Sequence, residues 1–493
     1  MTSAQNPFFK PFDTKHQTPP FSKITNADYV PAVDRGIELA NAEIKAIVDN
    51  KAKPNFKNTI VALENVGADL NRVLGTFFPL MSANADDEMM NLSMDISRKL
   101  SDYSTSITLN EGLWKRVKAV YDNRAKYKLT PEDSMLLQTT YDSFARSGAT
   151  LEGADRDTYK RLSAELSELT TKFGQNVQKE LPTYQIWLAE EDLVGLPESQ
   201  KEAAALAAKE AGKEGKYLFT LDQPVYMAFL KYSDRRDLRE KMYRLYTGRN
   251  ITGEYSNVEV QKRIAEVRRQ LANLLGKDTY AEYSLVNTMA QNPENVYKLL
   301  NQLREAYAPA AKAELDEITK FASELEGKPV TLMPWDYSYY SNKHRAARYS
   351  FDEEALRPYF ELSNVVNGVF GLATKLYGLQ FREDPEIQVY HPDVKAYEVT
   401  DADGKYIGVL YTDFFPRASK RPGAWMTNFK EQWTDAKGKN SRPHVSIVMN
   451  FTKPTKERPA LLTLGEVETF LHEFGHALHA IFSQVRYEAL SCT

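Results

Sequence analysis

The chain has 493 residues, of which 42% are hydrophobic and 26% are charged, a composition typical of soluble globular proteins. This length exceeds what one compact core usually accommodates, so we expect two or more domains or one large helical body. The net charge of -4 comes from 63 basic and 67 acidic side chains, and this near balance provides no basic field to hold nucleic acid or an anionic membrane.

Two features of the sequence bear on the cellular compartment. Its only cysteine is Cys492, which excludes a disulfide within the chain. Residues 1–20 are polar and rich in proline, without the apolar run of a signal peptide, and no stretch of the sequence approaches a membrane span. We therefore expect a cytoplasmic protein.

Helical periodicity dominates the N-terminal part of the sequence. Apolar residues recur at helical spacing after Asn26, the predicted N-cap, again from about Asn58, and in a third segment over Thr158–Lys179. The Ala/Glu/Lys-rich segment Glu198–Ala211 has high helix propensity without an apolar stripe and is predicted to be a surface helix. The glycine-containing residues 212–216 that follow predict a break between an N-terminal helical region, 1–215, and a second region, 216–493.

Long helices are predicted again beyond residue 257, before the texture of the sequence changes. Gly276 and Gly327 stand where C-terminal caps would end helices over Val258–Leu275 and Pro293–Leu325. Strands are predicted for four segments rich in β-branched and aromatic residues: Ile387–Tyr390, Ala396–Thr400, Tyr406–Asp413 and His444–Phe451. The expected fold is mainly α-helical, with a small antiparallel sheet next to the last helix.

The last predicted helix contains the motif His472-Glu473-Phe474-Gly475-His476. The two histidines are four residues apart, so their imidazoles project from one helix face and can converge on one cation, for which zinc is well suited. Glu473 lies about 100° round the helix from His472, where it can reach a metal-bound water without being a ligand. We expect it to act as the general base that activates this water toward a peptide carbonyl. His479 is either a group that supports the ligands or a half-buried histidine on the helix flank.

Chance and a purely structural role are the alternatives to a metal site. The chain has seven histidines, and a chance H-E-x-x-H is expected on the order of one per cent of the time in such a chain. Three of these histidines fall within the eight residues from 472 to 479, on one predicted helix. Two histidines that satisfy buried polar groups would be the structural alternative, and we regard zinc binding as the better interpretation.

Further segments along essentially the whole chain resemble, in order, the thimet oligopeptidase and peptidyl-dipeptidase family of zinc peptidases, and within it the bacterial peptidyl-dipeptidases. The segments that carry the resemblance are Asn6-Pro7-Phe8, Asn58–Glu64, Pro334–Tyr337 with Tyr340, Leu356–Phe360, Tyr390–Val394, Tyr411–Phe415, Gly423–Met426, His472–His476 and Arg486–Ser491.

The resemblance implies a two-lobed, mostly helical zincin-like body whose deep channel admits short peptides and excludes folded proteins. It implies a monomer with one zinc ion on His472 and His476, with Glu473 as the catalytic residue. The implied reaction is hydrolysis of short peptides, with release of C-terminal dipeptides. A strand edge beside the metal, expected within Val445–Phe451, would hold the substrate backbone by β-addition. The side chains that bind substrate and the choice between dipeptide release and internal cleavage remain unknown.

One departure from the family concerns the third zinc ligand, a glutamate about 25 residues past the second histidine. Here 493 − 476 leaves 17 residues after His476, so we expect a polypeptide without this ligand and without the C-terminal helical part, inactive or weakly active. Glu488 and Cys492 are possible substitutes, but a solvated residue at a helix end and a substituted turn residue are the preferred interpretations. The alternative function is a non-catalytic helical module that captures peptides, although Glu473 favours an enzyme.

Overall fold

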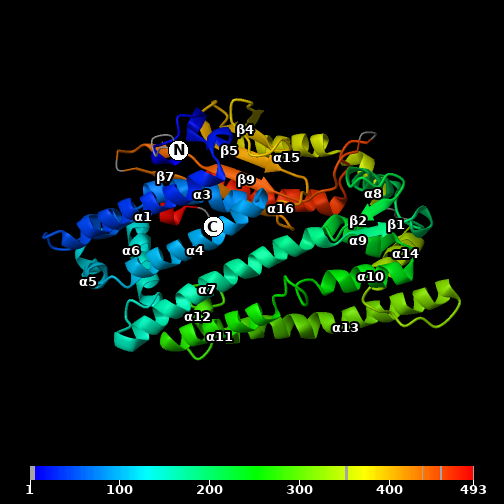
Figure 1. The fold of residues 1–493 in the computed structure, drawn as a ribbon, viewed down its shortest axis with the longest axis horizontal. Coiled ribbons are helices and arrows are strands. Elements are labelled where there is room, and N and C mark those ends of the chain that lie inside the picture. Colours follow the sequence, from blue (N-terminus) through cyan, green and yellow to red (C-terminus); the bar gives the residue numbers. More distant parts are fainter. Residues whose placement is uncertain (1–5, 350–352, 436, 456–457, 492–493) are drawn as a thin grey trace. The chain divides into compact units, whose positions relative to one another are not determined.

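The computed structural model describes residues 6–349, 353–435, 437–455 and 458–491, and the prediction of a mainly α-helical protein with small sheets is confirmed (Figure 1). The chain forms two compact units, described separately below. The sheet unit combines residues 1–172, 366–449 and 469–493, and the helical unit combines residues 173–365 and 450–468. The predicted boundary between residues 215 and 216 falls inside the helical unit and stays a prediction.

The N-terminal part of the sheet unit is helical. Thr25, not Asn26, caps the first helix, and its backbone N–H donates to the Asp28 carboxylate at 2.8 Å. Gly67, with a φ of 81°, divides the second predicted helical segment. A π-helical turn and a short helix precede Gly67, and a longer helix follows it. The helices are α1 (Asn26–Asp49), α2 (Ala62–Glu64), α3 (Ala68–Ala83), α4 (Asp87–Thr108), α5 (Glu111–Asp122), α6 (Pro131–Arg146) and α7 (Gly153–Glu180), which continues into the helical unit.

A five-stranded sheet forms the centre of the sheet unit. Its strands lie in the order β3-β4-β5-β9-β6 and are β3 (Gln380–Glu383), β4 (Lys395–Thr400), β5 (Tyr406–Asp413), β9 (His444–Val448) and β6 (Trp425–Lys430). After β5 the chain returns along β6 and then enters β9, which runs in the same direction as β5. Strands β5 and β9 are therefore parallel, and the sheet is mixed rather than wholly antiparallel as expected. The strand predicted at Ile387–Tyr390 is wrong: this segment is a loop whose Ile387 side chain is buried in the core.

The position of β9 corrects the expectation of a free strand edge within residues 445–451. β9 pairs with β5 on one side and with β6 on the other, and all its residues are buried. Burial of every residue, including the polar His444 and Ser446, is typical of a central strand, because both faces and both edges are covered. Among the described residues β6 has a strand partner on one side alone, so no strand pairs with its other edge, although Gly75 of α3 lies close to the Phe429 carbonyl oxygen at the end of this strand.

Helices cover both faces of this sheet. On one face α1 and α3 contribute to a single hydrophobic cluster with the strands that includes Tyr29, Phe77, Val409, Tyr411 and Phe429. On the other face lie α15 (Leu362–Tyr377) and α16 (Leu464–Phe482). The ring of Phe370 on α15 lies 5.0 Å from that of Tyr397 on β4, and the ring of Phe470 on α16 lies 5.2 Å from that of Phe414. The candidate site is therefore built on a helix held by a two-sided core.

The helical unit confirms the predicted helix ends. Gly276 and Gly327 follow α11 and α13 with φ angles of 73° and 64°, the left-handed conformation that glycine adopts at a C-cap. Its helices are α8 (Glu198–Glu210), α9 (Gln223–Tyr232), α10 (Arg236–Thr247), α11 (Val258–Leu274), α12 (Tyr280–Leu285), α13 (Pro293–Glu326) and α14 (Tyr337–Tyr349), with a two-stranded sheet of β1 (Ile186–Leu188) and β2 (Tyr217–Phe219). Two short strands, β7 (Trp433–Thr434) and β8 (Asn440–Ser441), belong to the sheet unit. No helix in the described part of the chain has the length and apolarity to cross a membrane.

A buried ion pair stabilises the helical unit. The fully buried carboxylate of Asp336 accepts hydrogen bonds from Arg239, whose side chain is 1% exposed, at 3.0 Å and from Arg236 at 2.6 Å. Burial acts to raise the pKa of Asp336, but hydrogen bonds from Arg236, the Met333 amide and Arg239 together hold this pKa below its usual value.

We expect Asp336→Ala to lower the free energy of unfolding by about 3–5 kcal/mol, because it leaves Arg239 charged and buried without its carboxylate. Chemical denaturation measures this change. Arg236→Ala is the matched control: its side chain is 50% exposed, so we expect a cost below about 1 kcal/mol. Equal costs for the two variants would contradict the assignment of Asp336 as the centre of the network.

Candidate metal centre

A capping box fixes the start of helix α16. The hydroxyl of Thr463 accepts a hydrogen bond from the Glu466 N–H at 3.1 Å, and the Glu466 carboxylate accepts one from the Thr463 N–H at 2.8 Å. The second oxygen of this carboxylate accepts a bond from the N–H of Thr452 at 2.8 Å. These bonds satisfy donors at the helix N-terminus and set the residue at which the first turn begins.

Apolar side chains on one face of α16 pack it against the sheet. Those that are buried on this face include Phe470, Phe474, Ala477, Ala480 and Ile481. Phe470 contacts Phe414, just past the end of β5, whereas Ile481 lies beside Gly408, near its start. Helix α16 therefore runs antiparallel to β5. A methyl group on Gly408 would lie 3.2 Å from the Pro443 carbonyl oxygen, so the missing side chain leaves room for this carbonyl group beside β5.

The two histidines of the motif lie on the exposed side of α16. His472 and His476 are both exposed, their ring centroids are 4.9 Å apart, and their planes meet at 81°. His479 is exposed as well, one turn further along. His472 and His476 lie between Phe470 and Ile481 along α16, so they lie opposite the C-terminal half of β5. In the register of the sheet, this half of β5 is aligned through β9 with residues 425–428 of β6.

Glu473 differs from both histidines because it is only 7% exposed. No group in the described part of the chain donates a hydrogen bond to its carboxylate or forms an ion pair with it. A largely buried glutamate without such a partner gains no hydrogen bond or ion pair from its position. A structural role therefore does not explain a glutamate at this position, whereas Glu466 on the same helix has three hydrogen bonds and a clear structural role.

The donor chemistry of the histidine pair fits zinc, since two imidazoles on one helix face are common ligands of this ion. Within the described residues, no third histidine, cysteine, aspartate or glutamate joins His472 and His476 in a group that could hold a metal ion. The described residues thus bring together two candidate ligands of a zinc ion, His472 and His476.

Comparison with known proteins identifies the family. The model described as peptidase family M3 matches residues 229–493. The chain is also 35% identical over 494 residues to the dipeptidyl carboxypeptidase of Escherichia coli (strain K12). The alignment covers 100% of this chain and 72% of that protein. The chain belongs to peptidase family M3. This is a family of zinc metallopeptidases, so the resemblance found in the sequence is confirmed.

Two further M3 relatives have other printed names. The chain is 33% identical over 492 residues to oligopeptidase A of Escherichia coli (strain K12), covering 99% of this chain and 72% of that protein. It is 27% identical over 471 residues to the thimet-like oligopeptidase of Dictyostelium discoideum, covering 93% of this chain and 69% of that protein. The M3 chain described here therefore spans about seven-tenths of the length of these relatives.

Glu488 does not join the histidines of the M3 motif. It begins the 3-10 turn Glu488–Leu490 and lies partly buried, not freely solvated as expected. Burial first, and then the neighbouring carboxylates of Glu64 and Glu431, raise the pKa of Glu488 to about 7. This carboxylate belongs to a separate acidic group, and Cys492, the other considered substitute, lies outside the described residues.

The structure also contains a buried charged cluster that the sequence did not reveal. It centres on Asp413 at the end of β5, with Arg417 and Lys420 in the loop that follows. The sequence places these three charged residues within eight positions, beginning at the last residue of β5. Such spacing could have indicated a charge cluster, but it is equally typical of a solvated loop.

Proposed function

We propose that this M3 chain serves the zinc-dependent hydrolysis of short peptides with release of C-terminal dipeptides. In this proposal His472 and His476 are two ligands of one zinc ion and Glu473 is the general base. The observation that carries it is the largely buried side chain of Glu473, which has no hydrogen-bond or ion-pair partner among the described residues and adjoins an exposed histidine pair. When bound, zinc acidifies a coordinated water and polarises the peptide carbonyl. Glu473 accepts the proton of the attacking water and returns it to the leaving amine.

We further propose that a peptide binds in extended form along the free edge of β6. An unpaired strand edge offers backbone donors and acceptors to an added strand. Two features support β6: it ends the sheet, and its residues 425–428 lie at the level of the histidine pair. Dipeptide release is preferred to internal cleavage because of the relative named dipeptidyl carboxypeptidase, at 35% identity. The relative named oligopeptidase A, at 33%, makes internal cleavage the second candidate.

The catalytic region is proposed to comprise residues 216–493, in line with the family match over 229–493. A monomer in the cytoplasm, with short peptides as its partners, remains the expectation. Because the described residues offer two zinc ligands, we propose that the polypeptide 1–493 binds zinc weakly and cleaves peptides slowly or not at all. The same observation favours the alternative, a module that binds peptides without cutting them.

Incubation of the chain with zinc and an oligopeptide, followed by mass spectrometry of the products, tests the proposed function. We expect slow release of C-terminal dipeptides that stops when a chelator is added. Peptide binding without zinc-dependent cleavage would identify the non-catalytic module instead. Cleavage that continues unchanged in chelator would contradict a zinc mechanism.

A further inference from the structure

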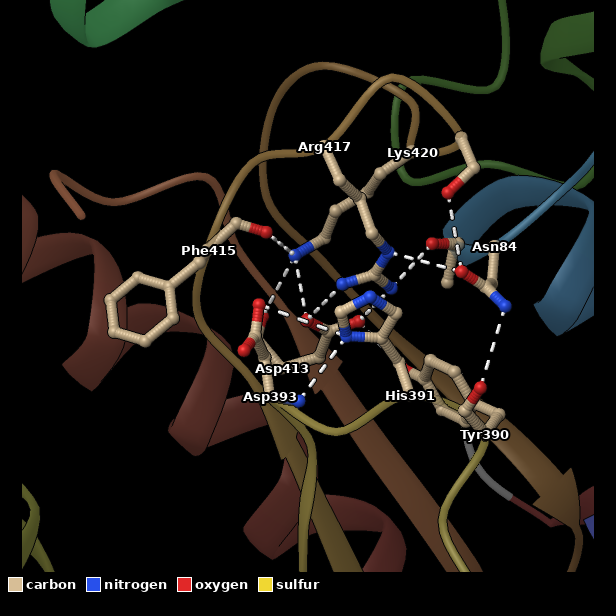
Figure 2. Close-up of polar contacts among 10 residues, drawn as sticks. Asn84, Tyr390, His391, Asp393, Asp413, Phe415, Arg417 and Lys420 are labelled. Atoms are coloured by element: carbon tan, nitrogen blue, oxygen red, sulfur yellow. Dashed lines mark hydrogen bonds and ion pairs between the residues drawn. The ribbon is translucent and has the colours of Figure 1, made fainter. Parts of the chain in front are cut away.

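A buried cluster of charges lies where β5 ends (Figure 2). The side chain of Asp413 is fully buried, and its carboxylate accepts hydrogen bonds from Arg417 at 2.6 and 2.9 Å and from Lys420 at 2.9 Å. The hydroxyl of Tyr390 donates a further bond at 2.8 Å. Lys420 is also fully buried and donates to the carbonyl oxygen of Phe415 at 2.7 Å. Two cations in the loop thus surround one carboxylate on the sheet.

The same cluster attaches the loop of residues 414–424 to the end of helix α3. Arg417 donates to the carbonyl oxygen of Ala83 at 2.5 Å. The backbone N–H of Arg421 donates to the carbonyl oxygen of Ser82 at 2.8 Å. The loop is therefore held by two elements. Arg417 and Lys420 bind it to Asp413 of β5, and Arg417 and the backbone of Arg421 bind it to the end of α3.

This loop also delivers the chain to β6. Asp413 and Trp425 pair with Val448 from opposite sides, so the loop crosses the C-terminal end of β9 between them. The guanidinium group of Arg421 lies over the ring of Trp425, 4.7 Å from its centroid. The first residues of β6 are thus held by side chains and backbone of the loop that the cluster anchors.

Burial of the charge on Lys420 is costly, and an apolar side chain of similar length would fill the same space without that cost. Retention of a buried ion pair is understandable where it fixes one arrangement of the chain among several. The arrangement fixed here is the crossing from β5 to β6.

We propose that Lys420 and Arg417, through their pairing with Asp413, are positioning residues that hold β6 where its free edge accepts a peptide. This inference rests on the proposed peptide-binding function of β6.

Within the cluster of Asp413, Arg417 and Lys420, the charge on Lys420 is the one that changes with pH near neutrality. Burial, the largest cause, lowers the pKa of Lys420 to about 8, although Asp413 opposes the shift. The titratable and charged groups that face the cluster are Asp413, Arg417, Asp393, Tyr390 and His391. A lysine whose pKa is lower in the folded chain than its usual 10.5 makes folding more favourable as pH rises from about 8 toward 10.5. A loss of peptide binding in this window would therefore not follow from unfolding driven by Lys420.

Fluorescence anisotropy with an N-terminally labelled oligopeptide that lacks titratable side chains, in the absence of zinc, measures the binding. We expect Lys420→Met to weaken peptide binding by about tenfold or more at pH 7, because a displaced β6 is competent to bind only part of the time. Arg239→Met is the matched control. It removes a buried cation paired with a buried carboxylate in the helical unit, and we expect the Kd to stay within about twofold although stability falls.

A pH series separates positioning from folding. For the unsubstituted chain we expect the Kd to rise by about tenfold between pH 7 and pH 9, whereas Lys420→Arg, which keeps its charge, should show little change. Circular dichroism at each pH verifies that the chains are folded. A flat profile of the unsubstituted chain, or equal weakening by Lys420→Met and Arg239→Met, would overturn the positioning role alone. Absence of peptide binding by the unsubstituted chain would overturn the proposed role of β6 as well.

Discussion

Replacement of His472 or His476 by alanine is expected to lower the zinc affinity of the chain by more than about a hundredfold. Each variant leaves one imidazole where two were available, and the loss of a ligand exceeds the 10- to 100-fold effects seen when a group that merely orients a ligand is removed. Titration against a competing chromophoric chelator measures the affinity. Because both side chains are exposed and neither contributes to the core, we expect the free energy of unfolding without zinc to change by less than about 0.5 kcal/mol.

His479→Ala is the matched control for these two variants. His479 is exposed on the same helix, one turn past His476, so its replacement removes the same chemical group from nearly the same surface. We expect the zinc affinity to stay within about threefold, since a third ligand at this position is absent from the described structure. A loss equal to that of His476→Ala would instead make His479 a ligand. Tight one-to-one binding by the unsubstituted chain would mean that a further ligand has been recruited.

Helix ends and the positions of three strands, β4, β5 and β9, could be predicted from the sequence because local chemistry determines them. Gly276 and Gly327 end α11 and α13, since glycine adopts the left-handed conformation that closes a helix. Strand β5 has the predicted bounds, Tyr406–Asp413, because its β-branched and aromatic run is flanked by turn residues. These features depend on interactions within a few residues of the chain.

The neighbours of a strand depend on distant parts of the chain and were predicted less well. The β-branched residues of His444–Val448 indicate a strand, but they do not say whether the strand lies at the edge or the centre of a sheet. Strand β6 was missed because its residues are mostly half-buried and show no simple alternation of apolar and polar side chains. The free edge could be located only once the order of the strands was known.

The candidate site shows the same division. The spacing of His472 and His476 predicts a common helix face, and the structure places both on the exposed side of α16. By contrast, the burial of Arg417 and Lys420 is not visible in their local sequence. Arg417 is shielded partly by the end of α3, whose Ala83 lies 334 residues earlier in the chain. Charge type can be read from the sequence, whereas desolvation of a charge requires the tertiary structure.

Glu473→Gln is expected to lower the rate of zinc-dependent peptide cleavage by about 10²- to 10⁴-fold, because the amide cannot accept the proton of the attacking water. The variant keeps the shape of the side chain and both histidines, so zinc affinity should stay within about threefold. Single-turnover kinetics with the chain in excess and zinc near saturation give the rate of the chemical step, even where that step is slow. Cleavage at an unchanged rate would exclude Glu473 as the general base.

The stability of the same variant makes this test more specific. Since the Glu473 carboxylate has no hydrogen-bond or ion-pair partner in the described part of the chain, its neutralisation should change the free energy of unfolding by less than about 1 kcal/mol. Glu466→Ala, on the same helix, removes the capping box and should cost about 1–2 kcal/mol while leaving the chemistry of Glu473 in place. The Glu473 variant would then change the cleavage rate but not the stability, and the Glu466 variant would change the stability but not the cleavage rate. A general disturbance of helix α16 would change both quantities in both variants.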